Sequence, residues 1–367
     1  MSIVAEIRNR IADKIRVHSE PPPSIMLRPA TQSTPPSPPE KRYAPSPFKL
    51  PVLQERMLNP EVLIEITSRC NFACDYCTSP FKDRPKADMT MELFQHIVKQ
   101  LPGITARDIR LHVDGEPTMH AQFREMVQLV NERGMRVALA TNGSRLDPSM
   151  LELNIWMTIT VSTTPEEFKT RHKKMDFDKY VETVTNYVRE WGRRDNKQVL
   201  MLQFIHGRPD QPDADLKRQM AMVERFIEQA ELKQNSVWKP EDPTLFWKSA
   251  TSSVRTLKYD IVGGGLYPIN GQLVVPKVTD VGFCNSPWQR LTILCDGRVG
   301  FCCVDLSGKA THTEPGEIWE KPLVELWRDH QKVQHIRQEF TQGRVSEDIC
   351  RKCLGGWQVP VIEHSIY

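Results

Sequence analysis

The sequence predicts an α/β fold, a partial (β/α)6 TIM-type barrel that carries a small cysteine-rich α+β extension at its C-terminal end. Three observations predict it. Between residues 61 and 234, apolar runs alternate with stretches of helical periodicity, a pattern typical of parallel β/α units. This alternation stops over residues 235–283. After residue 283, the chain holds six of its nine cysteines.

The predicted strands are short apolar runs with helical stretches between most of them. The strands cover residues 62–66, 109–113, 137–140, 158–161 and 199–205, and the helices cover residues 91–101, 122–133, 180–191 and 216–230. Right-handed crossovers connect parallel strands, so the carboxyl ends of the strands meet at one edge of the sheet. Barrels of this type place their chemistry at that edge.

Residues 1–60 are predicted to form a short N-terminal helix and a proline-rich disordered tether. Apolar residues recur at helical spacing over residues 3–17, and twelve prolines lie between Pro21 and Pro60. Proline fixes φ and lacks an N–H donor, which disfavours regular helices and central strands. The predicted domains are therefore this N-terminal segment, a catalytic core over residues 61–234, a linker over residues 235–283 and a cysteine-rich domain over residues 284–367.

Charge and hydropathy exclude several classes of partner. The net charge is only +3, and no long run of one sign occurs, so we expect no nucleic-acid partner. No segment approaches the roughly 20 apolar residues of a membrane-spanning helix. Residues 1–18 mix charges with apolar residues and lack the features of a signal peptide. We therefore expect a cytoplasmic protein without membrane contact.

The first group of cysteines has the spacing C-x3-C-x2-C and follows the strand predicted at residues 62–66. Cys70, Cys74 and Cys77 therefore lie on a loop at the predicted catalytic edge. Three thiolates cannot satisfy all the irons of a four-iron cluster, so one iron stays open for a ligand. The spacing alone also allows a zinc site completed by a fourth residue elsewhere, or cysteines with no metal.

With the aromatic Tyr76 before its last cysteine, this motif closely resembles that of the radical SAM superfamily. The resemblance implies a 4Fe-4S cluster on the three cysteines, whose open iron chelates the amino and carboxylate groups of S-adenosylmethionine, with Tyr76 beside the cofactor. One electron, supplied by reduced flavodoxin or ferredoxin, then cleaves S-adenosylmethionine to methionine and a 5′-deoxyadenosyl radical.

Further segments resemble the same family in the same order along the chain. The segment Asp114 to Pro117 resembles the family's G-G-E-P, with Asp114 in place of the first glycine, and implies contacts to the methionine amino group. Thr141 to Gly143 resembles the family's T-N-G turn, and a serine ends the next strand as in the family. The implied cofactor-binding residues are Gly115, Glu116, Pro117, Asn142, Ser162 and, on the fifth strand, Gln203.

The second group of cysteines surrounds a predicted hairpin. Asp296 and Gly297 separate two short apolar runs, which is a hairpin signal. Four thiolates around it complete a coordination shell, and the spacing alone also permits a structural zinc site. The arrangement resembles the SPASM and twitch extensions of radical SAM enzymes, and this implies a second, auxiliary 4Fe-4S cluster. The implied ligands are Cys284, Cys302, Cys350 and Cys353.

Neighbouring cysteines are not predicted to bind this cluster. Gly297 followed by four residues reaches Cys302, and adjacent residues of an extended strand point to opposite faces, so we expect only one of this pair to face the cluster. Cys302 is the predicted ligand, and the alternative for Cys303 is a ligand or a hydrogen donor to a substrate radical. Cys295 is predicted to be a bystander as well. Asp305 is a candidate catalytic base or substrate contact.

The expected protein is a radical SAM oxidoreductase or maturase that abstracts a hydrogen atom from its substrate. The preferred substrate is a peptide or protein, modified by cross-linking, oxidation or epimerisation, because this is the commonest activity among relatives with such an extension. The alternative is dehydrogenation of a small polar metabolite, such as an aminosugar or cyclitol alcohol, which a single auxiliary cluster favours. A metal-binding scaffold without turnover is the third hypothesis.

Overall fold

The structure, a computed structural model, describes most of the chain from residue 50 to residue 344 and a few residues outside it. The described residues are 42–43, 50–74, 77, 84–162, 164–172, 174–194, 198–206, 228–231, 245–248, 253–258, 267–269, 272–274, 280–281, 284–302, 308–344, 346–347 and 350. They fall into two compact units. The described residues of the first unit lie within the ranges 71–76 and 139–262, and those of the second unit lie within the ranges 26–70, 77–138 and 263–367.

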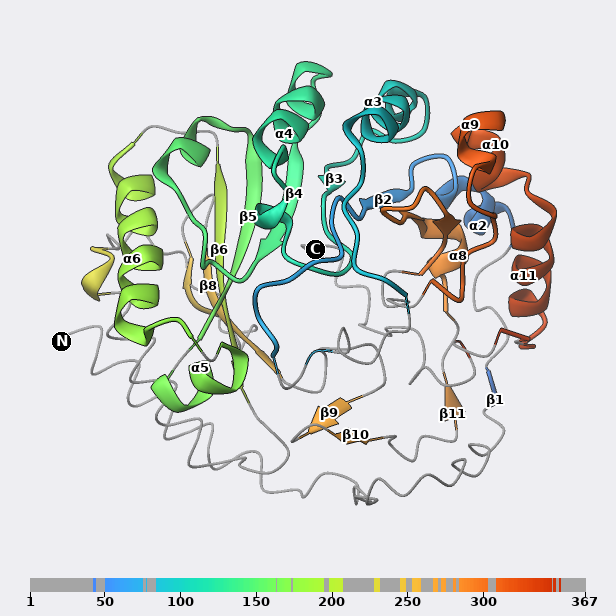
Figure 1. The fold of residues 1–367 in the computed structure, drawn as a ribbon. Helices are drawn as coiled ribbons and strands as arrows, with labels where there is room; N and C mark the ends of the chain where they lie inside the picture. Colours follow the sequence, from blue (N-terminus) through green and yellow to red (C-terminus); the bar gives the residue numbers. More distant parts are fainter. Residues whose placement is uncertain are drawn as a thin grey trace. The chain divides into compact units, whose positions relative to one another are not determined.

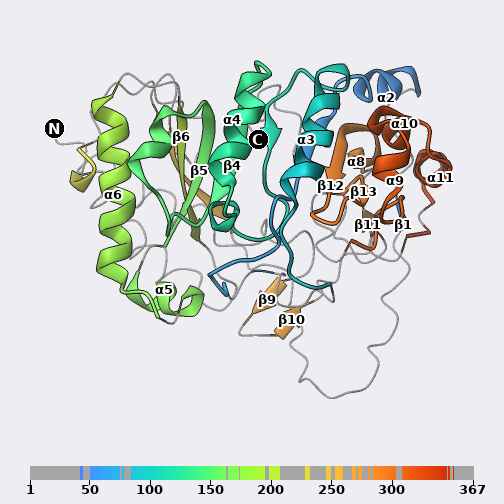
Figure 2. The ribbon, with the colours of Figure 1, turned by 45° about the horizontal axis from the view of Figure 1, so that its top comes forward.

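The second unit is built on a mostly parallel sheet with the strand order β13-β12-β2-β3-β4. Figure 1 labels β2, β3 and β4, and Figure 2 labels β12 and β13. Its strands are β2 (Glu61–Ile64), β3 (Ile109–Arg110), the start of β4 (Val137–Thr141), β12 (Arg290–Ile293) and β13 (Val299–Gly300). Its helices are α2 (Leu50–Arg56), α3 (Met91–Gln100), α4 (Phe123–Glu132), α8 (Ser286–Gln289), α9 (Glu317–Glu320), α10 (Leu323–Arg328) and α11 (Gln331–Thr341). Short two-stranded pairs join β1 (Arg42–Tyr43) to β11 (Asp280–Val281) and β9 (Tyr267–Ile269) to β10 (Gln272–Val274).

The first unit contains the end of β4 and the strand order β4-β5-β6-β8-β7. Strand β6 pairs in parallel with β5 and β8, and β7 pairs antiparallel with β8. The elements are β5 (Ile155–Val161), β6 (Val199–His206), β7 (Leu245–Lys248), β8 (Ser253–Lys258), α5 (Pro165–Arg171) and α6 (Phe177–Arg193). Figure 2 shows α6 from a second direction. In the described part of the chain, no helix is both long and apolar enough to cross a membrane.

Local sequence explains why these elements form. Helix α3 begins after Thr90, whose Oγ1 accepts the N–H of Leu93 at 3.2 Å, and α6 begins after Asp176, whose Oδ1 accepts the N–H of Lys179 at 3.0 Å. Alternate residues of β5 are buried, as expected for a strand with one face on the core. Caps and burial thus fix the β/α units that carry the site.

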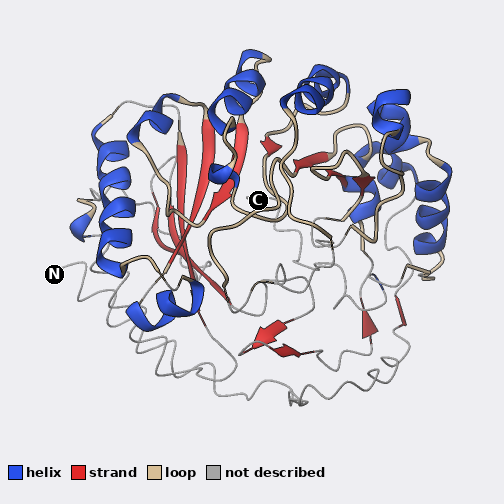
Figure 3. Ribbon diagram, viewed as in Figure 1, coloured by secondary structure: helices blue, strands red, loops and turns tan. Residues whose placement is uncertain are grey.

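The predicted α/β fold with a parallel-dominated, open sheet is confirmed (Figure 3). Each of the five predicted strands overlaps an observed strand. Strand β3 is shorter than predicted and ends at Arg110 rather than residue 113. The chain leaves the sheet here because residues 114–116 turn back onto the segment before Cys70, where Gly115 takes a φ of +77°.

The described residues also show features that were not predicted. Helix α2 forms within the proline-rich segment because Pro51 occupies its first turn, where a missing N–H costs nothing, and because Leu53 is buried. Strand β8 joins the sheet beside β6. The predicted hairpin at Asp296 and Gly297 is present, but its strand β12 also pairs in parallel with β2. The helix predicted over residues 3–17 and most of the helix predicted over residues 216–230 lie outside the described residues.

Candidate functional site

The three cysteines of the first group lie on the loop that follows β2, as predicted. Cys70 and Cys77 belong to the second unit and Cys74 to the first, and all three are half-buried. Three soft thiol ligands on one partly exposed loop fit the donor set of an iron-sulfur cluster. Among the described residues, no three His, Cys, Asp or Glu side chains converge closely enough to hold a metal ion, so the structure does not gather this ligand set.

Gly115 and Glu116 pack directly on the segment that leads to Cys70. A Cβ atom at Gly115 would lie 2.5 Å from the Thr67 carbonyl oxygen and 2.7 Å from that of Arg69. The N–H of Glu116 donates to the Arg69 carbonyl at 2.7 Å. Only glycine fits both the positive φ and this close approach of two backbones. The segment that resembles the family's G-E-P therefore fixes the residues immediately before Cys70.

The side chain of Glu116 is buried and shapes its own turn. Its Oε1 accepts the hydroxyl of Thr118 at 2.6 Å and the N–H of Thr118 at 3.2 Å. These bonds cap the short 3-10 helix Pro117–Met119. Glu116 is thus held in one orientation, which a residue that binds a cofactor needs.

In the first unit, Asn142 contacts the cysteine loop through Asn71, the residue after Cys70. The Asn142 Nδ2 donates to Asn71 Oδ1 at 3.0 Å, and Asn71 Nδ2 donates to the Ser144 hydroxyl at 2.9 Å. The Oδ1 of Asn142 accepts the N–H of Ser144 at 2.9 Å. The T-N-G turn therefore positions the loop, and a direct contact of Asn142 with a cofactor stays a prediction.

Tyr180 on α6 was missed by sequence reasoning. Its buried hydroxyl lies 3.0 Å from the Asn142 carbonyl and 3.3 Å from that of Thr160, and it accepts the N–H of Ser162 at 3.3 Å. Burial raises its pKa above the ordinary value. Tyr180 therefore ties the end of β4 to the end of β5. No motif marks it, and only its place on the buried face of an amphipathic helix distinguishes it.

The Phe72 ring, on the cysteine loop, packs against the rings of Phe168 and Tyr180. Its centroid lies 5.7 Å from that of Phe168 and 6.2 Å from that of Tyr180. The N–H of Ala73 donates to the Arg171 carbonyl at 2.7 Å. Residues 71–73 are therefore anchored to α5 and α6, next to Cys74.

Replacing Tyr180 by Phe should lower the free energy of unfolding by about 1 to 3 kcal/mol, because the carbonyl of Asn142 and the N–H of Ser162 lose a buried partner. Hydrogen exchange should become faster at the Ser162 amide. Tyr187→Phe is the matched control, because Tyr187 lies on the same helix as Tyr180 and its hydroxyl also makes a buried hydrogen bond. That hydroxyl donates to Gln198 Oε1 at 2.8 Å. Faster exchange at Ser162 in the Tyr187 variant would contradict the assignment to Tyr180.

Ser162 and Gln203 lie on neighbouring strands. Ser162 is only 1% exposed at the end of β5, and no described residue offers its Oγ a hydrogen bond of standard geometry. A buried hydroxyl that lacks a protein partner fits a position that binds a ligand. Gln203 is half-buried on β6, opposite Thr160. Both fit a cofactor site, and their contacts stay predictions.

The second cysteine group flanks the hairpin as predicted. Cys284 precedes α8 and Cys302 follows β13, and these two and Cys350 are half-buried. Cys295 is buried in the hairpin turn, and burial and the neighbouring Glu65 carboxylate raise the pKa of its thiol to about 12. A thiolate is the form that binds metal, so this environment disfavours Cys295 as a ligand. The candidates Tyr76, Cys303, Asp305 and Cys353 lie outside the described residues.

Comparisons with known proteins find relatives that match part of the chain and solved structures of similar fold. A tungsten-containing aldehyde ferredoxin oxidoreductase cofactor-modifying protein from Pyrococcus furiosus is 36% identical over 92 residues, which are 24% of this chain and 25% of that protein. An S-adenosylmethionine-dependent nucleotide dehydratase from Selenomonas ruminantium is 32% identical over 92 residues, 25% of this chain and 33% of that protein. These matches therefore span a quarter to a third of each relative.

A crystal structure of Streptococcus suis SuiB bound to precursor peptide SuiA has a similar fold. The TM-score is 0.54 at 12% sequence identity, over 83% of this chain and 72% of that one. At this identity the likeness concerns the fold alone.

Two family models match in the order that the cysteine motifs predict. The model of the radical SAM superfamily matches residues 64–222, and that of the SPASM iron-sulfur cluster-binding domain matches residues 284–354. Together they span more than half of the chain. The cofactors of this combination are S-adenosylmethionine, the 4Fe-4S cluster that binds it and an auxiliary iron-sulfur centre. The chain belongs to the radical SAM superfamily and carries a SPASM iron-sulfur cluster-binding domain.

Proposed function

We propose that this radical SAM enzyme modifies a peptide or protein substrate by removing a hydrogen atom from it. The observation that carries the radical chemistry is the backbone of Gly115 and Glu116 packed on residues 67–69, directly before the C-x3-C-x2-C loop. The peptide class is supported by the SuiB structure, in which the protein is bound to a precursor peptide. Cross-linking, oxidation and epimerisation are all outcomes of one hydrogen abstraction.

In this proposal Cys70, Cys74 and Cys77 hold the first cluster. When bound, the cluster and S-adenosylmethionine supply reductive cleavage to a 5′-deoxyadenosyl radical. Gly115 and Glu116 fix the loop on one side of Cys70. The rings of Phe72 and Phe168 exclude water from the segment beside Cys74. The chain therefore supplies a fixed loop and a dry surface to a cofactor that does the chemistry.

The remaining assignments belong to the same proposal. Ser162, Gln203 and Asn142 are the proposed cofactor contacts in the first unit, and Pro117 is one in the second unit. Tyr76 is proposed as a further contact from its place in the sequence motif. Radical SAM enzymes need an electron donor, and reduced flavodoxin or ferredoxin fills this role here. Asp305 serves as a base or substrate contact. The auxiliary cluster is bound by Cys284, Cys302, Cys350 and Cys353, within a cysteine-rich domain over residues 284–367 that follows a core over residues 61–234.

Dehydrogenation of a small polar metabolite, such as an aminosugar or cyclitol alcohol, is the second candidate. The Selenomonas ruminantium relative, a nucleotide dehydratase, favours a small-molecule substrate, although dehydration is a different reaction from dehydrogenation. A single auxiliary cluster suits it as an acceptor for the second electron. The two candidates share all of the cofactor machinery and differ only in the substrate.

The test measures whether deuterium passes from a substrate in a cell extract to 5′-deoxyadenosine. The extract comes from cells grown in deuterated medium, so its peptides and metabolites carry deuterium. Anaerobically reconstituted enzyme, unlabelled S-adenosylmethionine and dithionite are added, and 5′-deoxyadenosine is analysed by mass spectrometry. Pretreatment of the extract with a protease, inactivated before the assay, should abolish the deuterium in this product. Transfer that survives the protease would contradict a peptide substrate and favour the metabolite. An extract pretreated with already inactivated protease is the control.

A further inference from the structure

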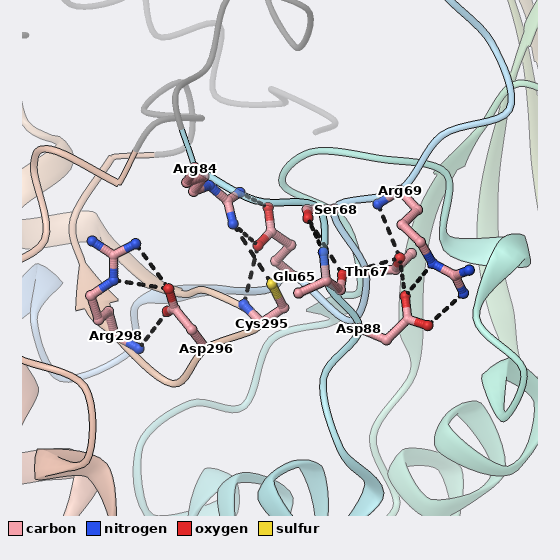
Figure 4. A network of polar contacts seen from close by, with 10 residues as sticks. Glu65, Thr67, Ser68, Arg69, Arg84, Asp88, Cys295, Asp296 and Arg298 are labelled. Atoms are coloured by element: carbon pink, nitrogen blue, oxygen red, sulfur yellow. Dashed lines mark hydrogen bonds and ion pairs between the residues drawn. The ribbon is translucent and has the colours of Figure 1, made fainter.

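The two ends of the cysteine loop are joined to each other within the second unit. Residues 66–68, before Cys70, lie antiparallel to residues 87–89, after Cys77 (Figure 4). The N–H of Ser68 donates to the Ala87 carbonyl at 2.9 Å, and the N–H of Met89 donates to the Ile66 carbonyl at 2.8 Å. The loop is therefore closed at its base by backbone hydrogen bonds.

A partly exposed ion pair reinforces this base. Arg69 Nε donates to Asp88 Oδ1 at 2.8 Å, and the Thr67 hydroxyl donates to the same oxygen at 2.6 Å. Burial opposes the ionisation of Asp88, but hydrogen bonds from Arg69 and Thr67 outweigh it and lower the pKa of Asp88. Because Arg69 is 42% exposed, water weakens this pair, and we expect it to contribute little alone.

A second ion pair, between Arg84 and Glu65, is buried. The Glu65 side chain is 0% exposed and that of Arg84 is 6% exposed. Arg84 binds both carboxylate oxygens, with Nη1 to Oε2 at 2.7 Å and Nη2 to Oε1. A buried pair of this kind persists only where its geometry is good and further hydrogen bonds satisfy it.

The turn of the β12–β13 hairpin supplies those further contacts. The N–H of Cys295 donates to Glu65 Oε2 at 3.1 Å, and Arg84 Nη1 lies 3.7 Å from Cys295 Sγ. The N–H of Glu65 itself donates to the Ile293 carbonyl at 2.8 Å. One buried carboxylate therefore joins the start of the cysteine loop, the segment after it and a turn between Cys284 and Cys302 (Figure 4).

We propose that Glu65 and Arg84 are positioning residues that hold the cysteine loop of the first cluster and the SPASM hairpin turn in one fixed arrangement. The inference rests on the proposed function, under which the loop and the hairpin carry the ligands of the two clusters. Breaking this pair should therefore loosen both cluster-binding segments, and the amides of both should exchange faster. A pair that merely stabilises the fold would not single out these segments.

A second arginine–glutamate pair lies at the other end of the same strand. Its carboxylate is also bound by Arg110, and Arg290 is 26% exposed, so this pair is a weaker contact between the same two strands. Arg290 Nε donates to Glu61 Oε2 at 2.9 Å, so this pair also joins β2 to β12. It lies at the start of β2, away from the cysteine loop. Arg290→Met is therefore the control for Arg84→Met. Arg84→Lys keeps the charge but loses the two-pronged contact, so it should restore the behaviour only in part.

The first measurement is hydrogen exchange on the anaerobic holoenzyme. In Arg84→Met, the amides of Ser68, Met89 and Cys295 should all exchange at least about tenfold faster, while amides of α4 keep their protection. Arg290→Met should leave the three amides unchanged. Equal effects of the two variants, or a change confined to Cys295, would overturn the inference.

The second measurement is the affinity for S-adenosylmethionine, from a spectral titration of the dithionite-reduced holoenzyme. Loss of a supporting side chain behind a metal site typically costs about 10- to 100-fold, so Arg84→Met should weaken binding by about tenfold at unchanged iron content. Unchanged affinity would overturn the inference. Failure of the unaltered enzyme to bind S-adenosylmethionine would instead refute the proposed function, and the exchange result would still decide the positioning role.

Discussion

Replacement of Cys70, Cys74 and Cys77 together by Ala is expected to abolish formation of 5′-deoxyadenosine and to halve the bound iron. The unaltered chain should hold about eight irons, four for each proposed cluster, and the triple variant about four. The sequence has no other cysteine before Cys284, so no neighbouring thiol on this loop can replace the lost ligands. Iron is measured on anaerobically reconstituted protein, and 5′-deoxyadenosine is measured after reduction by dithionite.

Cys295→Ala is the control for this variant. Its backbone N–H still donates to Glu65, and the loss of one buried sulfur should leave both the iron content and the product unchanged. Undiminished 5′-deoxyadenosine in the triple variant would refute the cluster assignment.

Cys302→Ala should also lower the iron to about four, but it should retain part of the cleavage, because the first cluster is intact. If Cys303→Ala lost the iron instead, the ligand choice would be wrong.

Local sequence predicted the elements whose formation depends on neighbouring residues. Strands β2, β4 and β6 lie within a residue or two of their predicted ranges, because an apolar run determines them. The hairpin at Gly297 was predictable because this residue takes a φ of +84°, which glycine adopts without strain. The spacing of the cysteines likewise indicated which of them belong to the first loop.

Long-range partners could not be predicted, because nothing in a local pattern names them. Arg290 and Glu61 are 229 positions apart, and their strands pair only because the chain returns to the edge of β2. In the sequence, Tyr180 is indistinguishable from the other apolar residues of its amphipathic helix. Its hydroxyl finds hydrogen-bond partners only because the ends of β4 and β5 lie beside it in the fold. The burial of Glu65 could not be predicted either, because a carboxylate at the end of a strand is usually exposed.

Gly115→Ala is expected to be among the most damaging single substitutions in the chain. The new Cβ would lie 2.5 Å from the carbonyl oxygen of Thr67 and 2.7 Å from that of Arg69. These are backbone atoms, so no side-chain rotation relieves the overlap, and the segment before Cys70 must move. Together with the unfavourable φ of +77°, this should cost about 3 to 5 kcal/mol of the free energy of unfolding.

Gly134→Ala separates the effect of the backbone angle from that of the close approach. Gly134 has a φ of +75°, but a Cβ there would meet nothing within 4 Å. It should therefore cost only the strain of the left-handed conformation, about 1 to 2 kcal/mol. Stability is compared by urea unfolding under anaerobic conditions, and the affinity for S-adenosylmethionine by spectral titration. Gly115→Ala should lose this affinity and Gly134→Ala should keep it, because only Gly115 touches the residues before Cys70. Equal losses of stability in the two variants would show that the angle alone, and not the packing on the cysteine loop, requires glycine at position 115.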